Sequence, residues 1–116
     1  MVNLSKIWIR HILGFIAITP RELIYVKGYK GGSTIHLSTE NNLNNIRTIH
    51  TGLTISVMEK ELNAFGFIRC HRNFLINPMF ITFYRPKEYI IKINDRICIP
   101  VARRKHATIK KLYNQI

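Results

Sequence analysis

The sequence predicts a mainly β fold of antiparallel sheets, with one internal helix and a short C-terminal helix. About seven short runs rich in β-branched and aromatic residues are separated by turn residues such as Asn, Gly and Pro. Two other segments, residues 56–66 and 103–113, instead place apolar residues at helical spacing. Strands therefore account for most of the chain, and helices for two short parts of it.

The first half of the chain predicts four strands, at residues 14–19, 22–27, 34–38 and 45–51. Pro20 presets the turn between the first two, and Asn41 and Asn42 form the turn before the fourth. The glycine-rich segment Lys27–Ser33 predicts a long hairpin loop. This loop is open to two interpretations, a plain connection or a contact with a nucleic-acid backbone. It lacks the spacing of a phosphate-cradling nucleotide loop.

The internal helix is predicted from a start signal, an apolar stripe and a stop signal. Ser56 and Glu59 have the spacing of an S-x-x-E capping box, and Gly66 is a typical helix terminator. The apolar stripe between them consists of Met58, Leu62 and Phe65. We expect this stripe to pack in the core.

The second half begins with two short apolar strands within residues 67–77, which flank a turn rich in hydrogen-bond donors. A turn at Asn77-Pro78 precedes a strand at residues 79–84. Residues 88–93 and 96–101 then form a hairpin across Asn94-Asp95, with apolar and polar residues alternating. The terminal helix, residues 103–113, is expected to turn three residues inward: Ile109, Leu112 and Ile116.

Net charge is the strongest signal in the composition. The 116 residues hold 18 Lys and Arg against 6 Asp and Glu, a net charge of +12. Nine cations and two anions lie between Arg85 and the C-terminus, so this segment holds more than half of the excess. Such a balance in a chain of one-domain length indicates a nucleic acid or an anionic membrane surface as partner.

Catalytic and metal-binding functions find no support in the sequence. The six acids are scattered, no nucleophile is paired with a base, and no Cys/His spacing matches a zinc site. We therefore expect no enzyme, no metal and no cofactor. Cys70 and Cys98 are too few for a disulfide scaffold, so a reducing, cytoplasmic location is the expectation. We expect both to be small buried residues, although a disulfide that strains the nearby turns is an alternative.

Residues 1–12 are interpreted as an N-terminal arm or linker, and residues 13–116 as the folded domain. Lys6, Arg10 and His11 interrupt the apolar residues of the arm, and no run approaches the roughly 18 needed to cross a bilayer. A strand-forming arm is the favoured interpretation, and a helix at a membrane surface is the alternative.

Several features, in order along the chain, resemble the LytTR family of bacterial DNA-binding domains over roughly residues 14–113. They are Leu23-Ile-Tyr25-Val, the Thr34-Ile-His-Leu37 strand, Val57-x-x-x-Glu61-Leu62, Phe67-x-Arg69-x-His71-Arg72-x-Phe74-Leu75-Ile76-Asn77, and Ile99-Pro100-Val101-x-Arg103-Arg104. The last two blocks are the most specific. Ala102 departs from the pattern, because the family often has serine there.

The resemblance implies an elongated β-rich domain that lacks a helix-turn-helix and places loops into successive major grooves of double-stranded DNA. Such domains bind as pairs, here a homodimer, on repeated half-sites and regulate transcription. The receiver domain common in these regulators is absent from the sequence. We therefore expect a separate signalling or membrane partner.

The resemblance also places the turn after Cys70 and the turn after Pro100 at DNA-facing positions. Arginine can pair with the O6 and N7 atoms of guanine, and asparagine with the N6 and N7 atoms of adenine. The expected base-reading residues are Arg103, Arg72, Asn73 and His71. The expected phosphate contacts are Arg104, Lys105, Lys30 and Arg85.

Other roles remain open for three residues in the first block. His71 is alternatively a half-buried residue that fixes the turn, Arg69 a partner of a glutamate, and Asn77 a turn residue. Two other protein classes also stay open. A small RNA-binding protein would use exposed aromatics for stacking, and Tyr29 and Tyr84 are the candidates. A membrane-surface module would use the N-terminal arm and the basic face.

Overall fold

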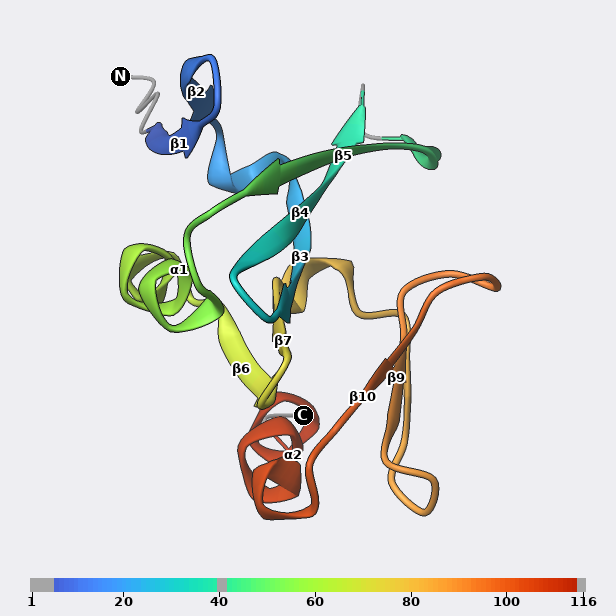
Figure 1. Cartoon of the computed structure of the whole chain (residues 1–116). Coiled ribbons are helices and arrows are strands. Elements are labelled where there is room, and N and C mark those ends of the chain that lie inside the picture. The colour runs from blue at the N-terminus through green and yellow to red at the C-terminus, as the bar shows by residue number, and fades with distance from the viewer. Residues whose placement is uncertain (1–5, 40–41, 115–116) are drawn as a thin grey trace.

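The computed structural model describes residues 6–39 and 42–114, which form three antiparallel sheets and two helices (Figure 1). The strands are β1 (Ile7–His11), β2 (Gly14–Ile18), β3 (Leu23–Tyr29), β4 (Gly32–Thr39), β5 (Asn42–Thr51), β6 (Ile68–His71), β7 (Phe74–Ile76), β8 (Phe83–Arg85), β9 (Ile90–Lys92) and β10 (Cys98–Pro100). The helices are α1 (Ile55–Leu62) and α2 (His106–Tyr113), with four 3₁₀ turns, η1 (Pro20–Glu22), η2 (Asn63–Phe65), η3 (Pro78–Phe80) and η4 (Arg103–Lys105). The mainly β, antiparallel fold class is confirmed.

A five-stranded sheet in the order β5-β4-β3-β7-β6 forms the centre of the molecule. One of its faces buries Val26 and Leu75 against Met58 and Leu62 of α1 and Ile9 of β1. Complete burial of side chains of this size stabilises the fold by about 1.5–3 kcal/mol each. The expected core role of Met58 and Leu62 is confirmed.

The other face of the central sheet packs against the β10-β9-β8 sheet and α2. The buried residues on the two faces of the central sheet form two core clusters, the first on the α1 side and the second on the α2 side. Successive residues of a strand point to opposite faces, so Leu75 lies in the first cluster and Ile76 in the second. Ile91 and Ile99 contribute from the small sheet, and Ile109 contributes from α2. The expected apolar alternation of the last hairpin is therefore present, although its strands are shorter than expected.

The strand expected in the N-terminal arm is present as β1, which pairs with β2 in a separate hairpin. Its Ile7 and Ile9 are buried in the first cluster. The fourth predicted strand is also present, but β5 begins at Asn42 and not at residue 45. The other residue of the turn predicted before it, Asn41, lies outside the described residues.

The prediction of a long loop at Lys27–Ser33 is wrong, because β3 extends to Tyr29 and β4 begins at Gly32, which leaves two residues between the strands. Only Lys30 and Gly31 form the turn, and Gly31 has a φ of +92° that favours glycine. The other glycines serve packing. A Cβ at Gly28 would lie 2.9 Å from the Cβ of Ile55, and a Cβ at Gly32 would clash with the carbonyl oxygen of Thr51.

The predicted start of the internal helix is also wrong. The cap is Thr54, whose hydroxyl accepts a hydrogen bond from the Val57 amide at 3.4 Å. Glu59 is therefore not part of a capping box. Phe65 does not belong to the buried stripe, because it lies in η2 and is 40% exposed. Gly66 ends the segment with a φ of +82°, as predicted.

The strand predicted at residues 79–84 is displaced towards the C-terminus, because residues 78–80 form η3. Asn77 explains this turn. Its side-chain oxygen accepts from the Met79 amide at 3.0 Å, and its side-chain nitrogen donates to the Leu23 carbonyl at 3.0 Å. The interpretation of Asn77 as a turn residue is confirmed. In the terminal helix Ile109 is buried but Leu112 is exposed, and Ile116 lies outside the described residues.

Candidate nucleic-acid interface

The first candidate contact is the turn between β6 and β7, which consists of Arg72 and Asn73. Both side chains are exposed, while Cys70 and Leu75 on the two supporting strands are fully buried. Because the strands are anchored in the core, the turn is presented on a rigid support.

Arg69 stabilises the β6–β7 turn through hydrogen bonds to its backbone. Its Nε donates to the His71 carbonyl oxygen at 3.1 Å, and its guanidinium also donates to the Arg72 carbonyl oxygen. Its Nη1 forms an ion pair with Glu59 of α1 at 2.9 Å. The interpretation of Arg69 as a glutamate partner is confirmed. Its donors are engaged within the protein and fix the path of the turn.

His71 closes the turn on its other side. The Asn73 amide donates to Nδ1 of His71 at 3.1 Å, and the edge of the ring contacts Phe74 at a centroid distance of 5.7 Å. Burial lowers the pKa of His71, and the neighbouring Arg72 and Arg69 lower it further. A lowered pKa favours the neutral ring, whose unprotonated nitrogen can accept the hydrogen bond from the Asn73 amide. This geometry fits a residue that fixes the turn, one of the two roles left open.

The second candidate contact is η4, which consists of three consecutive cations. Arg103 and Arg104 are exposed, and Lys105 is half-buried. The guanidinium of Arg103 lies 5.7 Å from the centroid of the Tyr89 ring, a cation–π distance. The backbone leading into η4 is held to the same residue, because the Val101 amide donates to the Tyr89 carbonyl oxygen at 2.8 Å.

A backbone hydrogen bond joins these two contacts. The Ala102 amide, directly before Arg103, donates to the carbonyl oxygen of Cys70 at 2.8 Å. The Cys70 Sγ atom also lies 3.6 Å from the Pro100 carbonyl oxygen. Since Cys70 precedes Arg72 by two residues, the two cationic turns lie side by side (Figure 1).

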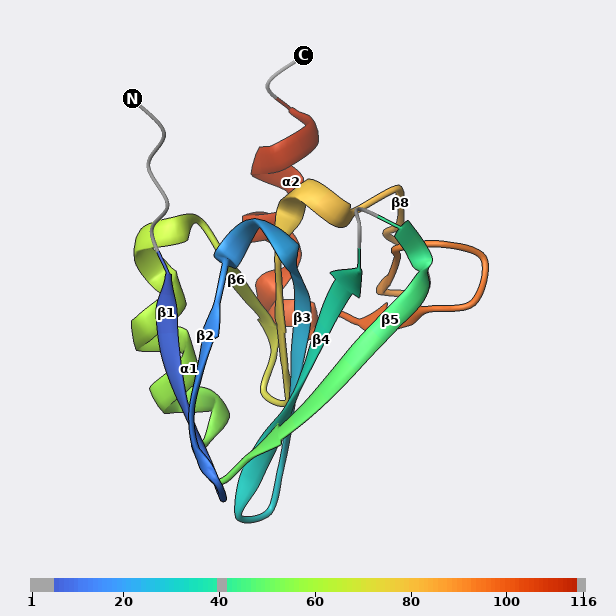
Figure 2. The same ribbon diagram turned by 90° about the horizontal axis from the view of Figure 1, so that it is seen from above.

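A third cationic turn, Lys30–Gly31 between β3 and β4, lies at the same end of the central sheet. The Gly28 amide donates to the Asn73 carbonyl oxygen at 2.8 Å, and Lys27 pairs with Phe74 in register. The β3–β4 and β6–β7 turns therefore point the same way, as Figure 2 shows. The expected contact Lys30 belongs to this end although the loop around it is short.

Arg85 is placed apart from these turns, at the end of β8 on the three-stranded sheet. It forms an ion pair with Glu88 at 3.0 Å, and its guanidinium lies 5.8 Å from the centroid of the Phe83 ring. Both partners are exposed, and such pairs contribute about 0–1 kcal/mol. The pair therefore does not prevent Arg85 from meeting another anion.

The cations of the three turns lack acidic partners in the part of the chain that the structure describes. The ion pairs found there involve Arg69 and Arg85 only. The turns therefore keep their positive charge, and the cations concerned are Arg72, Arg103, Arg104, Lys105 and Lys30. An anionic surface reaching this end of the molecule meets charge that the protein has not neutralised.

A family model described as the LytTr DNA-binding domain matches residues 14–114. The chain belongs to the LytTR family. The resemblance drawn from five sequence features, of which the last two are the most specific, is thus confirmed.

One curated protein and one solved structure are similar to this LytTR domain. The sensory transduction protein LytT of Bacillus subtilis strain 168 is 34% identical over an alignment of 104 residues that covers 84% of this chain and 42% of LytT. The chain therefore spans less than half the length of this relative. A solved LytTr DNA-binding domain, of a putative methyl-accepting/DNA response regulator from Bacillus cereus, aligns with a TM-score of 0.71 over 95% of this chain and 97% of that chain. At 19% identity this match shows a shared fold.

The two cysteines of the LytTR domain have different environments. Cys70 is fully buried in β6, and burial raises the pKa of its thiol to about 12. Cys98 is exposed in β10, so the expectation that both are buried is wrong for this residue. Both are free thiols.

Some residues that support the interface were missed in the sequence. Glu59 anchors Arg69 from α1, and His106 Nδ1 lies 2.7 Å from the Tyr84 hydroxyl beneath η4. Tyr84 is consequently half-buried and not the exposed stacking residue expected. No local pattern could reveal these pairs, because the partners are 10 and 22 positions apart in the sequence.

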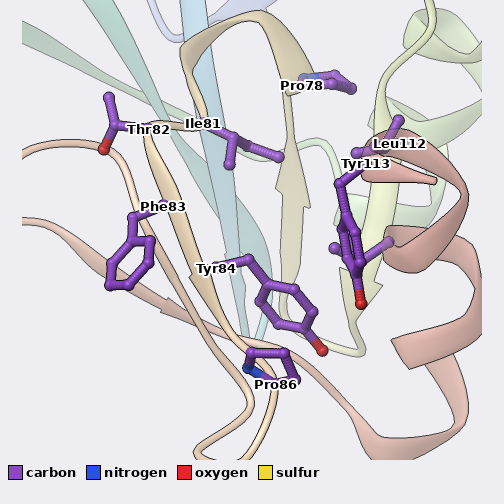
Figure 3. Close-up of a pocket in the computed structure, with 9 residues that line it drawn as sticks. Pro78, Ile81, Thr82, Phe83, Tyr84, Pro86, Leu112 and Tyr113 are labelled. Carbon is purple, nitrogen blue, oxygen red and sulfur yellow. The ribbon is translucent and has the colours of Figure 1, made fainter. Parts of the chain in front are cut away.

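A groove of about 540 Å³ lies between α2 and the segment around β8 (Figure 3). Its lining is mainly apolar and includes Ile81, Phe83, Leu112 and Tyr113. No acid, histidine or cysteine lines it. Across the described residues, no group of three potential metal ligands comes together, and no helix has the length and hydropathy needed to cross a membrane.

Proposed function

We propose that this LytTR domain binds double-stranded DNA sequence-specifically and thereby regulates transcription. The observation that carries the proposal is the Ala102–Cys70 hydrogen bond, which holds two exposed cationic turns side by side. Both turns follow backbone that is anchored by buried residues, Cys70 and Leu75 for the first and Ile99 and Val101 for the second. The major groove, about 12 Å wide, admits such turns, and each base pair presents a distinct donor and acceptor pattern there.

Arg103 is the principal base-reading residue in this proposal, followed by Arg72 and Asn73. All three are exposed and follow immediately after well-anchored backbone. His71 contributes mainly by holding the turn, because Asn73 already donates to its Nδ1. A bidentate contact of arginine with guanine discriminates between bases by about 1–3 kcal/mol.

The phosphate contacts come from the cations around these turns: Arg104, Lys105, Lys30 and Arg85. Lys30 extends the contact from the β3–β4 turn, which points the same way as the β6–β7 turn. Neutralising phosphates releases counterions, so affinity falls steeply with salt. These contacts supply affinity and orientation, and the base contacts supply specificity.

The domain acts as a homodimer on repeated half-sites in the cytoplasm, under the control of a separate signalling partner. The names of the two relatives, a sensory transduction protein and a DNA response regulator, support a signal-dependent role in transcription. Binding selection from a random duplex library tests the proposal directly. Recovery of a repeated motif supports it, and recovery of no motif, or of single-stranded RNA in a parallel selection, contradicts it.

Arg103→Ala separates base readout from general attraction. We expect this substitution to reduce the ratio of specific to non-specific DNA affinity by about tenfold or more, with an unchanged fold. Lys105→Ala should instead weaken binding to all sequences and reduce the salt slope by about one unit. Arg21→Ala is the matched control, since Arg21 is exposed in η1 at the opposite end of β3. An unchanged ratio in Arg103→Ala would falsify its assigned role.

A further inference from the structure

The β1–β2 hairpin exposes more large apolar side chains than a plain structural hairpin needs. Ile12 and Leu13 at its tip are 92% and 89% exposed, and Trp8 and Phe15 on its strands are 68% and 67% exposed. Single exposed apolar residues are normal, but a contiguous group rimmed by polar residues marks an interaction surface.

The register of the hairpin places these side chains together. Arg10 pairs with Phe15 and Trp8 pairs with Ala17, so these residues share the outer face. The inner face carries isoleucines that pack against the core. The outer apolar side chains do not belong to the core, because the hairpin packs its other face, with Ile7, Ile9 and Ile18 buried, against the first core cluster.

The tip has a defined shape. The Leu13 amide donates to Nδ1 of His11 at 3.2 Å, and Gly14 has a φ of +145° that a residue with a side chain rarely adopts. The Thr51 hydroxyl donates to the Arg10 carbonyl oxygen at 2.7 Å and attaches the hairpin to β5. Ile12 and Leu13 thus project from a braced support.

Positive charge accompanies the apolar group. Arg10 is exposed on β1 and Lys6 is exposed directly before it, and the β3–β4 turn, which carries Lys30, points towards the same end of the molecule as the hairpin tip (Figure 2). The whole chain carries +12. A second copy of the chain would bring like charges together, whereas an anionic bilayer offers the opposite charge next to an apolar interior.

We propose that the β1–β2 hairpin docks on an anionic lipid bilayer. Ile12, Leu13 and Phe15 enter the boundary between headgroups and acyl chains, and Trp8 lies at headgroup level, where its amphipathic ring is favoured. Lys6 and Arg10 meet the lipid phosphates. This docking site does not depend on the proposed DNA-binding function.

Trp8 makes the test specific, because it is the only tryptophan in the sequence and lies on the hairpin. The chain is titrated with vesicles of phosphatidylcholine alone and of phosphatidylcholine mixed with phosphatidylglycerol. We expect a blue shift of Trp8 emission with the mixed vesicles only, and quenching by lipids brominated on the acyl chains. Sedimentation with these vesicles without shift or quenching overturns the proposal, since it shows adsorption through another basic face.

Paired variants separate insertion from adsorption. Replacing both Ile12 and Leu13 by Ser should weaken binding to the mixed vesicles by about tenfold or more. Met79→Ser is the matched control, because Met79 is exposed in η3 and should leave vesicle binding unchanged. Circular dichroism confirms that each variant is folded. Equal vesicle affinity in both variants, or a blue shift that rises with protein concentration without vesicles, overturns the proposal, the latter in favour of a second copy.

Discussion

The β1–β2 and β6–β7 hairpins close their turns in the same way. In each, a histidine ends the first strand, and its Nδ1 accepts a hydrogen bond from the amide two residues later, at 3.2 Å for His11 and 3.1 Å for His71. The two residues that connect the strands differ completely between the two hairpins. The first tip is Ile12-Leu13 and the second is Arg72-Asn73. The same histidine–amide hydrogen bond therefore accompanies an apolar tip in one hairpin and a cationic tip in the other.

The two hairpins differ also in their support. The β6–β7 turn is held by Arg69, which is tied to α1 through Glu59, and its backbone is joined to η4 at Cys70. The β1–β2 hairpin rests on the first core cluster through Ile7 and Ile9. This difference fits the two proposed roles, because base readout requires a contact residue held in a fixed position, whereas entry into a fluid lipid surface requires only that the tip project.

The largest expected effect on stability comes from the core that both hairpins share. Ile9→Ala removes a fully buried side chain and should reduce the free energy of unfolding by about 2–5 kcal/mol. Urea unfolding measures this loss. Val57→Ala, at an exposed position on α1, is the control and should change stability by less than about 0.5 kcal/mol. If Ile9→Ala frees β1 while the remaining fold keeps its stability, the two hairpins do not share one cooperative core.

Exchanging the tips addresses the comparison directly. Changing Arg72→Ile together with Asn73→Leu should weaken specific DNA binding by about 2–6 kcal/mol, because two base contacts of about 1–3 kcal/mol each are lost. Titration of labelled duplexes measures the change. The reverse exchange, Ile12→Arg with Leu13→Asn, should abolish quenching of Trp8 by brominated lipids and leave specific DNA affinity unchanged. Specific binding that survives the first exchange contradicts the assignment of the β6–β7 tip.

An intermediate effect on stability is expected from a change of pH, through His36 in β4 of the central sheet. The His36 ring stacks on Tyr25 at 4.1 Å, and burial, helped by Lys27 and His50, lowers the pKa of His36 from 6.5 to about 4. The unfolded chain then binds a proton that the folded chain rejects between pH 6.5 and about 4. The free energy of unfolding should be highest above pH 6.5 and fall on acidification, by on the order of 2 kcal/mol when screening of the half-buried ring by solvent is allowed for. In His36→Gln, urea unfolding across this range should show a smaller decrease; an equal decrease excludes His36 as the cause.

The smallest effect is expected from the support of the cationic tip. Arg69→Ala removes the hydrogen bonds to the turn and should reduce the free energy of unfolding by about 1 kcal/mol, since Glu59 is 42% exposed and its ion pair adds little. Specific DNA affinity should fall more than non-specific affinity, because the tip loses its fixed path. Arg69→Lys keeps a charge near Glu59 but cannot reach both carbonyl oxygens, so only partial recovery is expected. Full recovery with lysine reduces the role of Arg69 to charge alone.

Local sequence patterns predicted most of the secondary structure. They failed where contacts with residues distant in the sequence determine the local conformation. The predicted apolar alternation of residues 88–101 and the predicted buried stripe of Met58 and Leu62 are confirmed, because burial follows directly from the spacing of these residues. The glycine-rich segment 27–33 was misread as a loop, since its glycines accommodate close neighbours such as Ile55. The cap at Thr54 and the turn at η3 likewise depend on where the preceding chain lies.

The sequence by itself determined the fold class, the LytTR membership and the positions of two cationic blocks, because alternation, turn residues and charge are local properties. Only the tertiary structure decided that those blocks meet at the Ala102–Cys70 hydrogen bond, that Arg69 turns inward to Glu59, and that Cys98 is exposed. These outcomes depend on how two sheets pack across residues distant in sequence. Short-range pattern contains no information about that packing, and so contact between the blocks could be seen only in the folded chain.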